Sequence, residues 1–208
     1  MDPAHHQHRG RVQVGSSIPP SFDDPGYGVF GHGLTIHSKE TAILYTEANT
    51  GPRMRLDFDT HAAMFSRALA HLDTAATKQL DAVGFDRPLR ELVRIRASQL
   101  NGCAYCVDMH SKDARAGGET EQRIYTLPVW RETPFFTEIE RVTLAFAEAM
   151  TLMTKNHVPV AAFDTLAAHY GPEEIAALVS LVVTINAWNA IGVSTRTWEP
   201  GSYTVGEA

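Results

Sequence analysis

Two cysteines and a histidine lie close together in residues 101–110, NGCAYCVDMH. Cys103 and Cys106 are the only cysteines of the 208-residue chain, and His110 follows four residues after the second. A thiolate can attack an electrophile or bind a metal, two thiols can close a disulfide, and an imidazole can exchange protons with them. The stretch therefore allows a redox-active pair, half of a zinc site, or two inert cysteines.

Helix geometry places these three side chains on one face. Residues three, four and seven positions apart lie close together on a helix because each residue turns it by about 100°. If a helix begins near Cys103, its amide dipoles favour a thiolate there, whereas Cys106 has His110 one turn away. These arguments leave open which of the two sulfurs reacts first.

A histidine that acts as a base usually has a carboxylate or carbonyl at its other ring nitrogen. Glu91, twelve residues before Cys103, is the candidate partner for His110. It belongs to the preceding predicted helix, so its distance from His110 depends on a crossing angle that periodicity does not fix.

A zinc site is the first alternative, because Cys103, Cys106 and His110 are all permissible zinc ligands. A structural site would need a fourth ligand from elsewhere, and three ligands on one helix would crowd a tetrahedron. A catalytic zinc with water as its fourth ligand avoids that objection. Two buried, inert cysteines are the second alternative, since free cysteine packs like a small hydrophobe.

The elements that must position these residues are helices. From Met54 onward apolar residues recur with helical periodicity and no strand-like alternation competes, which predicts an all-α domain over 54–208. Caps and breakers predict helices after a cap at Thr60, over 87–101, over 103–116, from Thr120, from 138, over 159–170 and over 172–195, with a loop between Pro128 and Pro134. The first helix carries an apolar stripe of Met64, Phe65, Ala68, Leu69 and Leu72.

Residues 1–53 have a different composition. They hold 7 of the 15 glycines, 5 of the 11 prolines and 5 of the 10 histidines, so we expect an irregular or disordered N-terminal extension. The segment MDPAHHQHRGRVQVGSS has no apolar stretch behind its basic residues, which does not fit a secretory signal and leads us to expect a cytoplasmic location. In that reducing compartment a Cys-x-x-Cys is more often metal-binding or catalytic than a structural disulfide.

Charge and hydropathy exclude other classes of protein. A formal charge of −6 leaves no basic excess for phosphates, so we expect no nucleic acid partner. Residues 175–193 are uncharged and long enough to span a bilayer. The amides of Asn186 and Asn189 would lack partners in lipid, which favours a buried helix and no membrane. Trp188 and Phe146 fall in helical stripes and are predicted to be core or interface residues.

Glu91, Cys103, Cys106 and His110 form the pattern E-x(11)-C-x(2)-C-x(3)-H, which resembles the signature of the alkylhydroperoxidase D family, within the carboxymuconolactone decarboxylase-like superfamily. The flanking text RELVRIRASQLNGCAYCVDMHSKDARAGGE is similar to that family, and NAWNAIGVSTRT resembles its last helix. The resemblance covers roughly 54–200 and implies an all-α multi-helix bundle that assembles as a homo-oligomer, a trimer or a hexamer.

The resemblance also implies a peroxidase that works through cysteine, with no bound cofactor or metal. Cys106 resembles the cysteine that attacks the peroxide and Cys103 the resolving cysteine, while Glu91 and His110 resemble the proton relay. The expected partners are a hydroperoxide substrate and an external dithiol reductant, such as a lipoyl-type protein. Family members often carry a histidine directly before the second cysteine, where this chain has Tyr105, a poorer proton acceptor at neutral pH.

Two other functions remain open from the sequence. The lactone decarboxylase that names the superfamily needs acid and base groups but no dithiol, so the paired cysteines disfavour it. A non-catalytic helical protein that binds zinc or senses oxidants could use the same cysteines.

Overall fold

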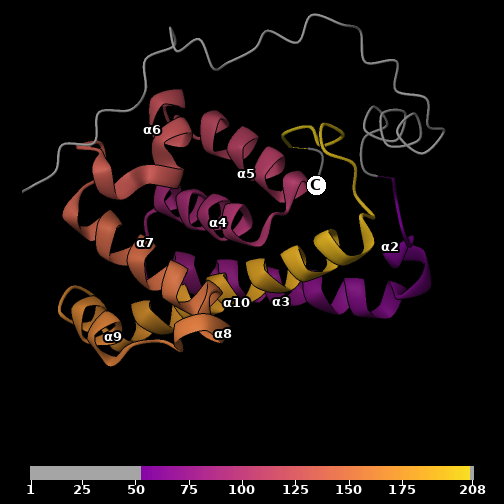
Figure 1. Cartoon of the computed structure of the whole chain (residues 1–208). Coiled ribbons are helices and arrows are strands. Elements are labelled where there is room, and N and C mark those ends of the chain that lie inside the picture. Colours follow the sequence, from indigo (N-terminus) through magenta and orange to yellow (C-terminus); the bar gives the residue numbers. More distant parts are fainter. Residues whose placement is uncertain (1–52, 207–208) are drawn as a thin grey trace, which may run out of the picture. The chain divides into compact units, whose positions relative to one another are not determined.

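The computed structural model describes residues 53–206, except for the side chain at position 156, and these residues form helices without any strand. The described part thereby confirms the all-α multi-helix prediction (Figure 1). The predicted extension over 1–53 lies outside the described residues, apart from Arg53. The helices are α2 (Phe58–His61), α3 (Ala63–Ala82), α4 (Arg87–Asn101), α5 (Ala104–Ala116), α6 (Glu121–Thr126), the 3₁₀ helix η1 (Leu127–Glu132), α7 (Glu138–Thr151), α8 (Met153–Asn156), α9 (Val160–Ala167) and α10 (Pro172–Thr195).

Helix α4 organises the core, because it contacts α5, α7 and α10. It begins where the Asp86 side chain accepts a hydrogen bond from the Leu89 backbone N–H at 3.1 Å. It ends at Gly102, whose φ of 73° lies in the left-handed region that glycine adopts without strain. The chain therefore turns at once into α5, and Cys103 becomes the N-cap of that helix.

Helix α10 is the one helix in residues 53–206 that is long and apolar enough to cross a membrane. Its apolar residues pack against α3 and α4. The Asn101 amide donates to the side-chain oxygens of Asn186 at 2.7 Å and Asn189 at 2.9 Å, and Asn189 donates to Ser98 Oγ at 3.0 Å. The amides within this apolar run thus have partners in the protein, as the buried-helix interpretation required.

The prediction of a helix cap at Thr60 is wrong. The Asp57 side chain accepts a hydrogen bond from the Thr60 backbone N–H at 3.1 Å and caps the short α2, which includes Thr60. The helical conformation is interrupted at Ala62, and α3 begins at Ala63. Of its predicted apolar stripe, Leu69 is buried, while Met64 and Phe65 are 80% and 58% exposed.

The loop predicted between Pro128 and Pro134 is also wrong in part. Residues Leu127–Glu132 form the 3₁₀ helix η1, with Pro128 in its first turn, where the missing N–H of proline costs no helical hydrogen bond. Trp130 of η1 is buried in the core. The predicted starts after Thr120, Thr137 and Gly171 are confirmed.

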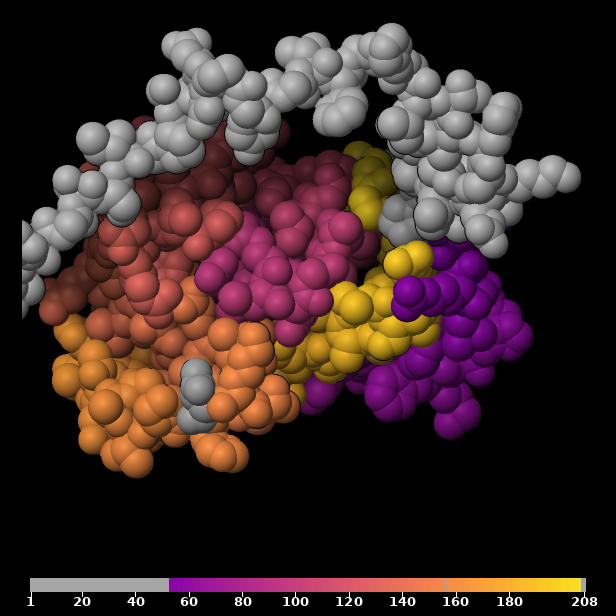
Figure 2. Space-filling view, viewed as in Figure 1, coloured from indigo at the N-terminus to yellow at the C-terminus, as the bar shows by residue number. Residues whose placement is uncertain are grey.

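The start of the described chain lies against the end of α10. The backbone N–H groups of Arg55 and Leu56 donate to the Thr195 carbonyl at 2.8 and 3.1 Å, and Figure 2 shows indigo residues against the yellow end of α10. Residues 197–206, which we call the C-terminal strap, then return to α5. Lys112 Nζ donates to the Tyr203 carbonyl at 2.9 Å.

Candidate active site

The two cysteines form a disulfide at the start of α5, with their Cα atoms 5.4 Å apart. As the N-cap residue, Cys103 also accepts a hydrogen bond at its Sγ from the Cys106 backbone N–H, at 3.4 Å. Both residues are buried, with exposed fractions of 2% and 4%. The structure thus holds the pair in its oxidised form.

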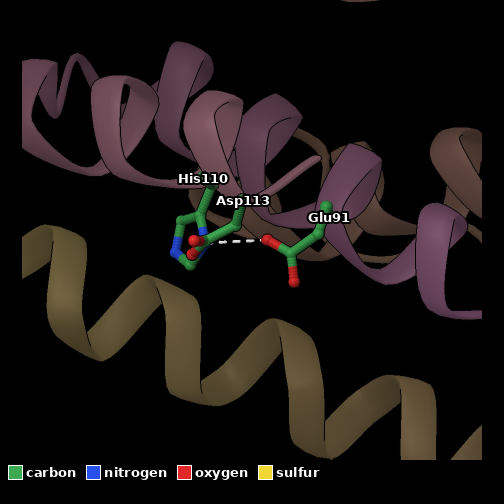
Figure 3. A group of neighbouring side chains, drawn as sticks. All are labelled: Glu91, His110 and Asp113. Atoms are coloured by element: carbon green, nitrogen blue, oxygen red, sulfur yellow. Dashed lines mark hydrogen bonds and ion pairs between the residues drawn. The ribbon is translucent and has the colours of Figure 1, made fainter. Parts of the chain in front are cut away.

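The crossing of α4 and α5, which periodicity could not fix, brings Glu91 and His110 together. Glu91 Oε2 lies 2.9 Å from His110 Nδ1, and Figure 3 shows the two side chains pointing toward one another from neighbouring helices. A carboxylate at Nδ1 favours the tautomer with a proton on that nitrogen. Nε2 of the neutral ring is then free to accept a proton.

Arg94 fixes the charge of the carboxylate. Its Nη1 donates to Glu91 Oε1 at 2.5 Å, from one helical turn away on α4. Burial alone would raise the pKa of Glu91, but the hydrogen bond to His110 and the positive charge of Arg94 outweigh it and hold the pKa below its ordinary value. Glu91 is therefore ionised at neutral pH and can stabilise a protonated His110.

Asp113 completes a group of potential metal ligands behind His110. Among the described residues, Glu91, His110 and Asp113 are the His, Cys, Asp or Glu side chains whose ligand atoms cluster, within 4.8 Å of one another (Figure 3). The Tyr203 hydroxyl donates to Asp113 Oδ1 at 2.7 Å, and burial together with this carboxylate raises the pKa of Tyr203 to about 12. Hydrogen bonds thus already engage these carboxylates, and the set differs from the Cys103, Cys106 and His110 of the zinc hypothesis.

A cavity of about 460 Å³ opens beside the disulfide. Cys106 and His110 both line it, whereas Cys103 does not. Three aromatic side chains form part of its wall: the Trp198 ring lies 5.6 Å from Tyr105 and 5.6 Å from Trp188, measured between centroids. The arrangement can hold an apolar molecule against the sulfur of Cys106.

The sequence interpretation missed part of this site. Arg94 could have been found, because it lies three residues after Glu91 on the same helix face. Trp188, predicted to be a core or interface residue, is half-buried in the cavity wall. Trp198 carries no sequence signal, because it lies in the strap beyond the last helix and reaches the cavity through the return of that segment.

Tyr105 lies in the cavity wall and not in the hydrogen-bonded relay. Burial, followed by the nearby Asp108 carboxylate, raises the pKa of its hydroxyl above the ordinary 10.0. At neutral pH the hydroxyl therefore stays protonated, which agrees with the expectation that tyrosine is a poorer proton acceptor than the histidine of other family members.

This fold and this site define a class of helical proteins that carry a Cys-x-x-Cys at a helix start, with a glutamate from the preceding helix. The model of the carboxymuconolactone decarboxylase family matches residues 64–149. The chain is also 44% identical over 109 residues to the uncharacterized protein YdfG of Bacillus subtilis (strain 168), covering 52% of this chain and 74% of that protein. The chain belongs to the carboxymuconolactone decarboxylase family.

Solved structures share the fold. A protein of unknown function from Agrobacterium tumefaciens, ATU0492, provisionally named an antioxidant defence protein AhpD, is 36% identical with a TM-score of 0.66, over 71% of this chain and 99% of that one. An uncharacterized peroxidase-related protein from Ralstonia eutropha JMP134, described as an alkylhydroperoxidase AhpD core, has a TM-score of 0.58 at 20% identity, over 78% and 84% of the two chains. The second likeness supports the fold alone.

Proposed function

We propose that the protein is a thiol-dependent peroxidase that reduces hydroperoxides through its cysteine pair. The observation that carries the proposal is that Cys106 and His110 line one cavity while Glu91 holds His110 at 2.9 Å. A carboxylate-oriented imidazole beside a thiol is the arrangement that generates a nucleophilic thiolate at neutral pH.

The reaction begins from the reduced pair. His110 takes the proton of the Cys106 thiol, and the thiolate attacks the terminal oxygen of the hydroperoxide. The S–O bond forms as the O–O bond breaks, and the alkoxide leaves as an alcohol with the proton from His110. The sulfenic acid on Cys106 then condenses with the Cys103 thiol, which releases water and gives the disulfide.

The cavity supports a hydroperoxide with an apolar body. Its aromatic wall of Tyr105, Trp188 and Trp198 offers ring faces to an organic group, which hydrogen peroxide lacks. The provisional antioxidant naming of the Agrobacterium tumefaciens protein, at 36% identity, supports a peroxidase function without indicating the kind of peroxide.

The remaining parts of the cycle are expectations that go with the proposal. An external dithiol, of the lipoyl type or a small molecule, returns the pair to its reduced form, and no bound cofactor or metal takes part. A cytoplasmic location would keep such a reductant available. The exposed Met64 and Phe65 on α3 suit burial between copies in a trimer or hexamer, which light scattering on the full chain would measure.

Thiol titration tests the proposal. After reduction, one equivalent of cumene hydroperoxide should remove both thiols of each wild-type chain, and a dithiol should restore them. Cys106→Ser should abolish peroxide consumption, whereas Cys103→Ser should still react once and accumulate sulfenic acid. An unchanged rate in Cys106→Ser would reject the assignment, and oxidation without turnover by any dithiol would favour an oxidant sensor.

The family name keeps one alternative function, a lactone decarboxylase. Glu91 and His110 supply the acid and base groups that this chemistry needs, and no dithiol is required. A Cys103→Ser/Cys106→Ser double variant separates the two functions. Decarboxylation of a γ-carboxymuconolactone by that variant would support the alternative, and loss of all activity would support the peroxidase.

Zinc binding by the reduced cysteines is tested by metal analysis. Anaerobically purified wild-type chain and His110→Ala should both lack stoichiometric zinc if the peroxidase is correct. About one zinc per chain, lost in the variant, would favour the zinc-binding protein.

A further inference from the structure

The two sulfurs of the disulfide have unequal surroundings. Cys106 lines the cavity of about 460 Å³, and Cys103 does not. Cys103 lies instead against α10 at Gly192, where an added methyl group would lie 3.0 Å from its Sγ and 3.5 Å from the Trp198 ring. Such close packing leaves no space for a reactant on that side of Cys103.

Trp198 lies against Gly192 at this contact and is held in place there. Its indole N–H donates to Asp59 Oδ2 at 2.8 Å, and its ring packs between Tyr105 and Trp188. The following strap residues are bound to α5, since the Gly201 N–H donates to Asp108 Oδ2 at 3.0 Å. Gly192 and Trp198 together therefore form a cover over Cys103 that leaves Cys106 accessible from the cavity.

Thiol–disulfide exchange requires the incoming thiolate to reach one sulfur while the other sulfur leaves. We propose that the reductant attacks the Cys106 Sγ and that Cys103 is the leaving group, with Gly192 and Trp198 determining this choice. The inference rests on the proposed redox function, and it gives the reductant the same sulfur that the peroxide meets.

The electrons and protons of the step balance as follows. The first thiolate of the dithiol bonds to Cys106 Sγ, the Cys103–Cys106 bond breaks, and its electron pair stays on Cys103. The second thiolate of the reductant then displaces Cys106 and closes the reductant's own disulfide. Two electrons pass to the protein, and the two cysteine sulfurs take up the two protons that the dithiol gives up.

The position of Cys103 suits it to leave. Its Sγ already accepts the Cys106 N–H at the first turn of α5, where the helix dipole favours negative charge. A thiolate stabilised in this way leaves faster in exchange. Cys106, released in the second step, can share the proton held by His110, whose Nδ1 is paired with Glu91.

The sulfur that is attacked can be identified directly on the full-length oxidised chain. A brief reaction with excess 2-mercaptoethanol, followed by acid quenching, alkylation and fragmentation of the peptide that holds both cysteines, shows which sulfur carries the adduct. We expect the adduct on Cys106 and the alkyl group on Cys103, by a ratio on the order of tenfold or more. An adduct mainly on Cys103 overturns the proposal.

Variants at Trp198 test the cover itself. Trp198→Ala should open the packing at Gly192 and Cys103 and bring the adduct ratio close to one, while Trp198→Phe, which keeps a ring beside Gly192, should restore the preference for Cys106. A ratio that stays unchanged in Trp198→Ala would remove Trp198 from the explanation. A merely structural role would alter stability without changing the ratio.

Single-cysteine chains give a second measurement that needs no turnover. In Ellman's assay the Cys106 thiol of Cys103→Ser should react faster than the Cys103 thiol of Cys106→Ser, by roughly tenfold. Equal rates would contradict the cover. If peroxide turnover is absent but the adduct still forms on Cys106, the proposed function fails and this inference stands. If peroxide turnover is present but the adduct forms mainly on Cys103, the proposed function stands and this inference fails.

Discussion

Two glutamates with arginine partners, the half-buried Glu91 and the buried Glu148, contrast two regions of the molecule. Glu91 accepts from Arg94 and faces His110 at the crossing of α4 and α5. Glu148 on α7 accepts from Arg96 at 2.6 Å and from the Trp130 indole at 2.9 Å through Oε1, and from Arg131 at 2.5 Å through Oε2. Each therefore has an arginine partner from α4.

The same physical effects act on both carboxyls. Burial would raise each pKa, but hydrogen bonds and the positive charges of neighbouring arginines lower it by more, so both pKa values stay below the ordinary glutamate value. They differ in the partner. Glu91 faces an imidazole, a group that can act as an acid or a base, whereas the arginines and the tryptophan around Glu148 only donate hydrogen bonds. A lowered carboxyl pKa therefore does not by itself mark a functional site. Glu91 is distinguished by its acid–base partner, His110, which lines a cavity.

The largest expected effect is on catalysis. Glu91→Gln removes the negative charge that orients and stabilises protonated His110, so the peroxidase rate should fall by about 10²–10⁴. Steady-state reduction of cumene hydroperoxide with a dithiol measures it. Glu148→Gln is the matched control and should stay within about twofold of the wild-type rate. A similar loss in both variants would erase the contrast.

The next effect is on the free energy of unfolding, where substitution of Glu148 should have a larger effect than substitution of Glu91. Glu148→Ala leaves the half-buried Arg96 without its carboxylate and the buried Trp130 without its acceptor, and should lower the free energy of unfolding by about 3–5 kcal/mol. Glu91→Ala should cost less, because Arg94 lies beside the cavity, which gives it access to water. Urea unfolding followed by circular dichroism compares the two; a greater loss in Glu91→Ala would contradict the assignment.

A smaller effect concerns acid. A carboxyl whose folded pKa is lowered stabilises the fold above its unfolded pKa, and this contribution is lost as pH falls through the folded value. The wild-type chain should therefore lose stability as pH falls below the ordinary glutamate pKa of 4.5. Glu148→Gln should start less stable at neutral pH and fall less steeply. Parallel curves in a pH series of urea unfolding would show that Glu148 is not the source.

The smallest effect is expected at Tyr105. Its hydroxyl stays protonated at neutral pH, so Tyr105→Phe should change the peroxidase rate by less than about twofold. Tyr105→His, which places a base before Cys106, should raise the rate. A large loss of peroxidase rate in Tyr105→Phe would show that the Tyr105 hydroxyl takes part in proton transfer and is not only part of the cavity wall.

Local signals account for the elements that were predicted well. The bounds of α4 follow from Asp86 and Gly102, which act on neighbouring backbone groups, and the N-cap at Cys103 follows from that turn. The start of the first long helix was misplaced, because its approach is fixed by distant contacts: the Phe58 N–H donates to Thr197 Oγ1 at 3.2 Å. No spacing rule connects residues so far apart in the chain.

The candidate site divides in the same way. Helical spacing placed Cys103, Cys106 and His110 on one face, but the meeting of Glu91 with His110 depends on how α4 packs on α5. The cover over Cys103 was beyond prediction, because it needs Gly192 and a tryptophan in a non-helical strap to converge on one sulfur. Contacts between elements, together with the start of α3 and the helix η1, could not be predicted from the sequence.

The amide bonds of Asn101 have a consequence for how the protein responds to oxidation. They tie the last residue of α4 to α10 just before the turn into Cys103, so the start of α5 is anchored without help from sulfur. The disulfide spans a separation of three residues inside a turn that backbone bonds already shape. Opening the disulfide should leave the helices in place, so that the oxidised and reduced forms differ only at the start of α5.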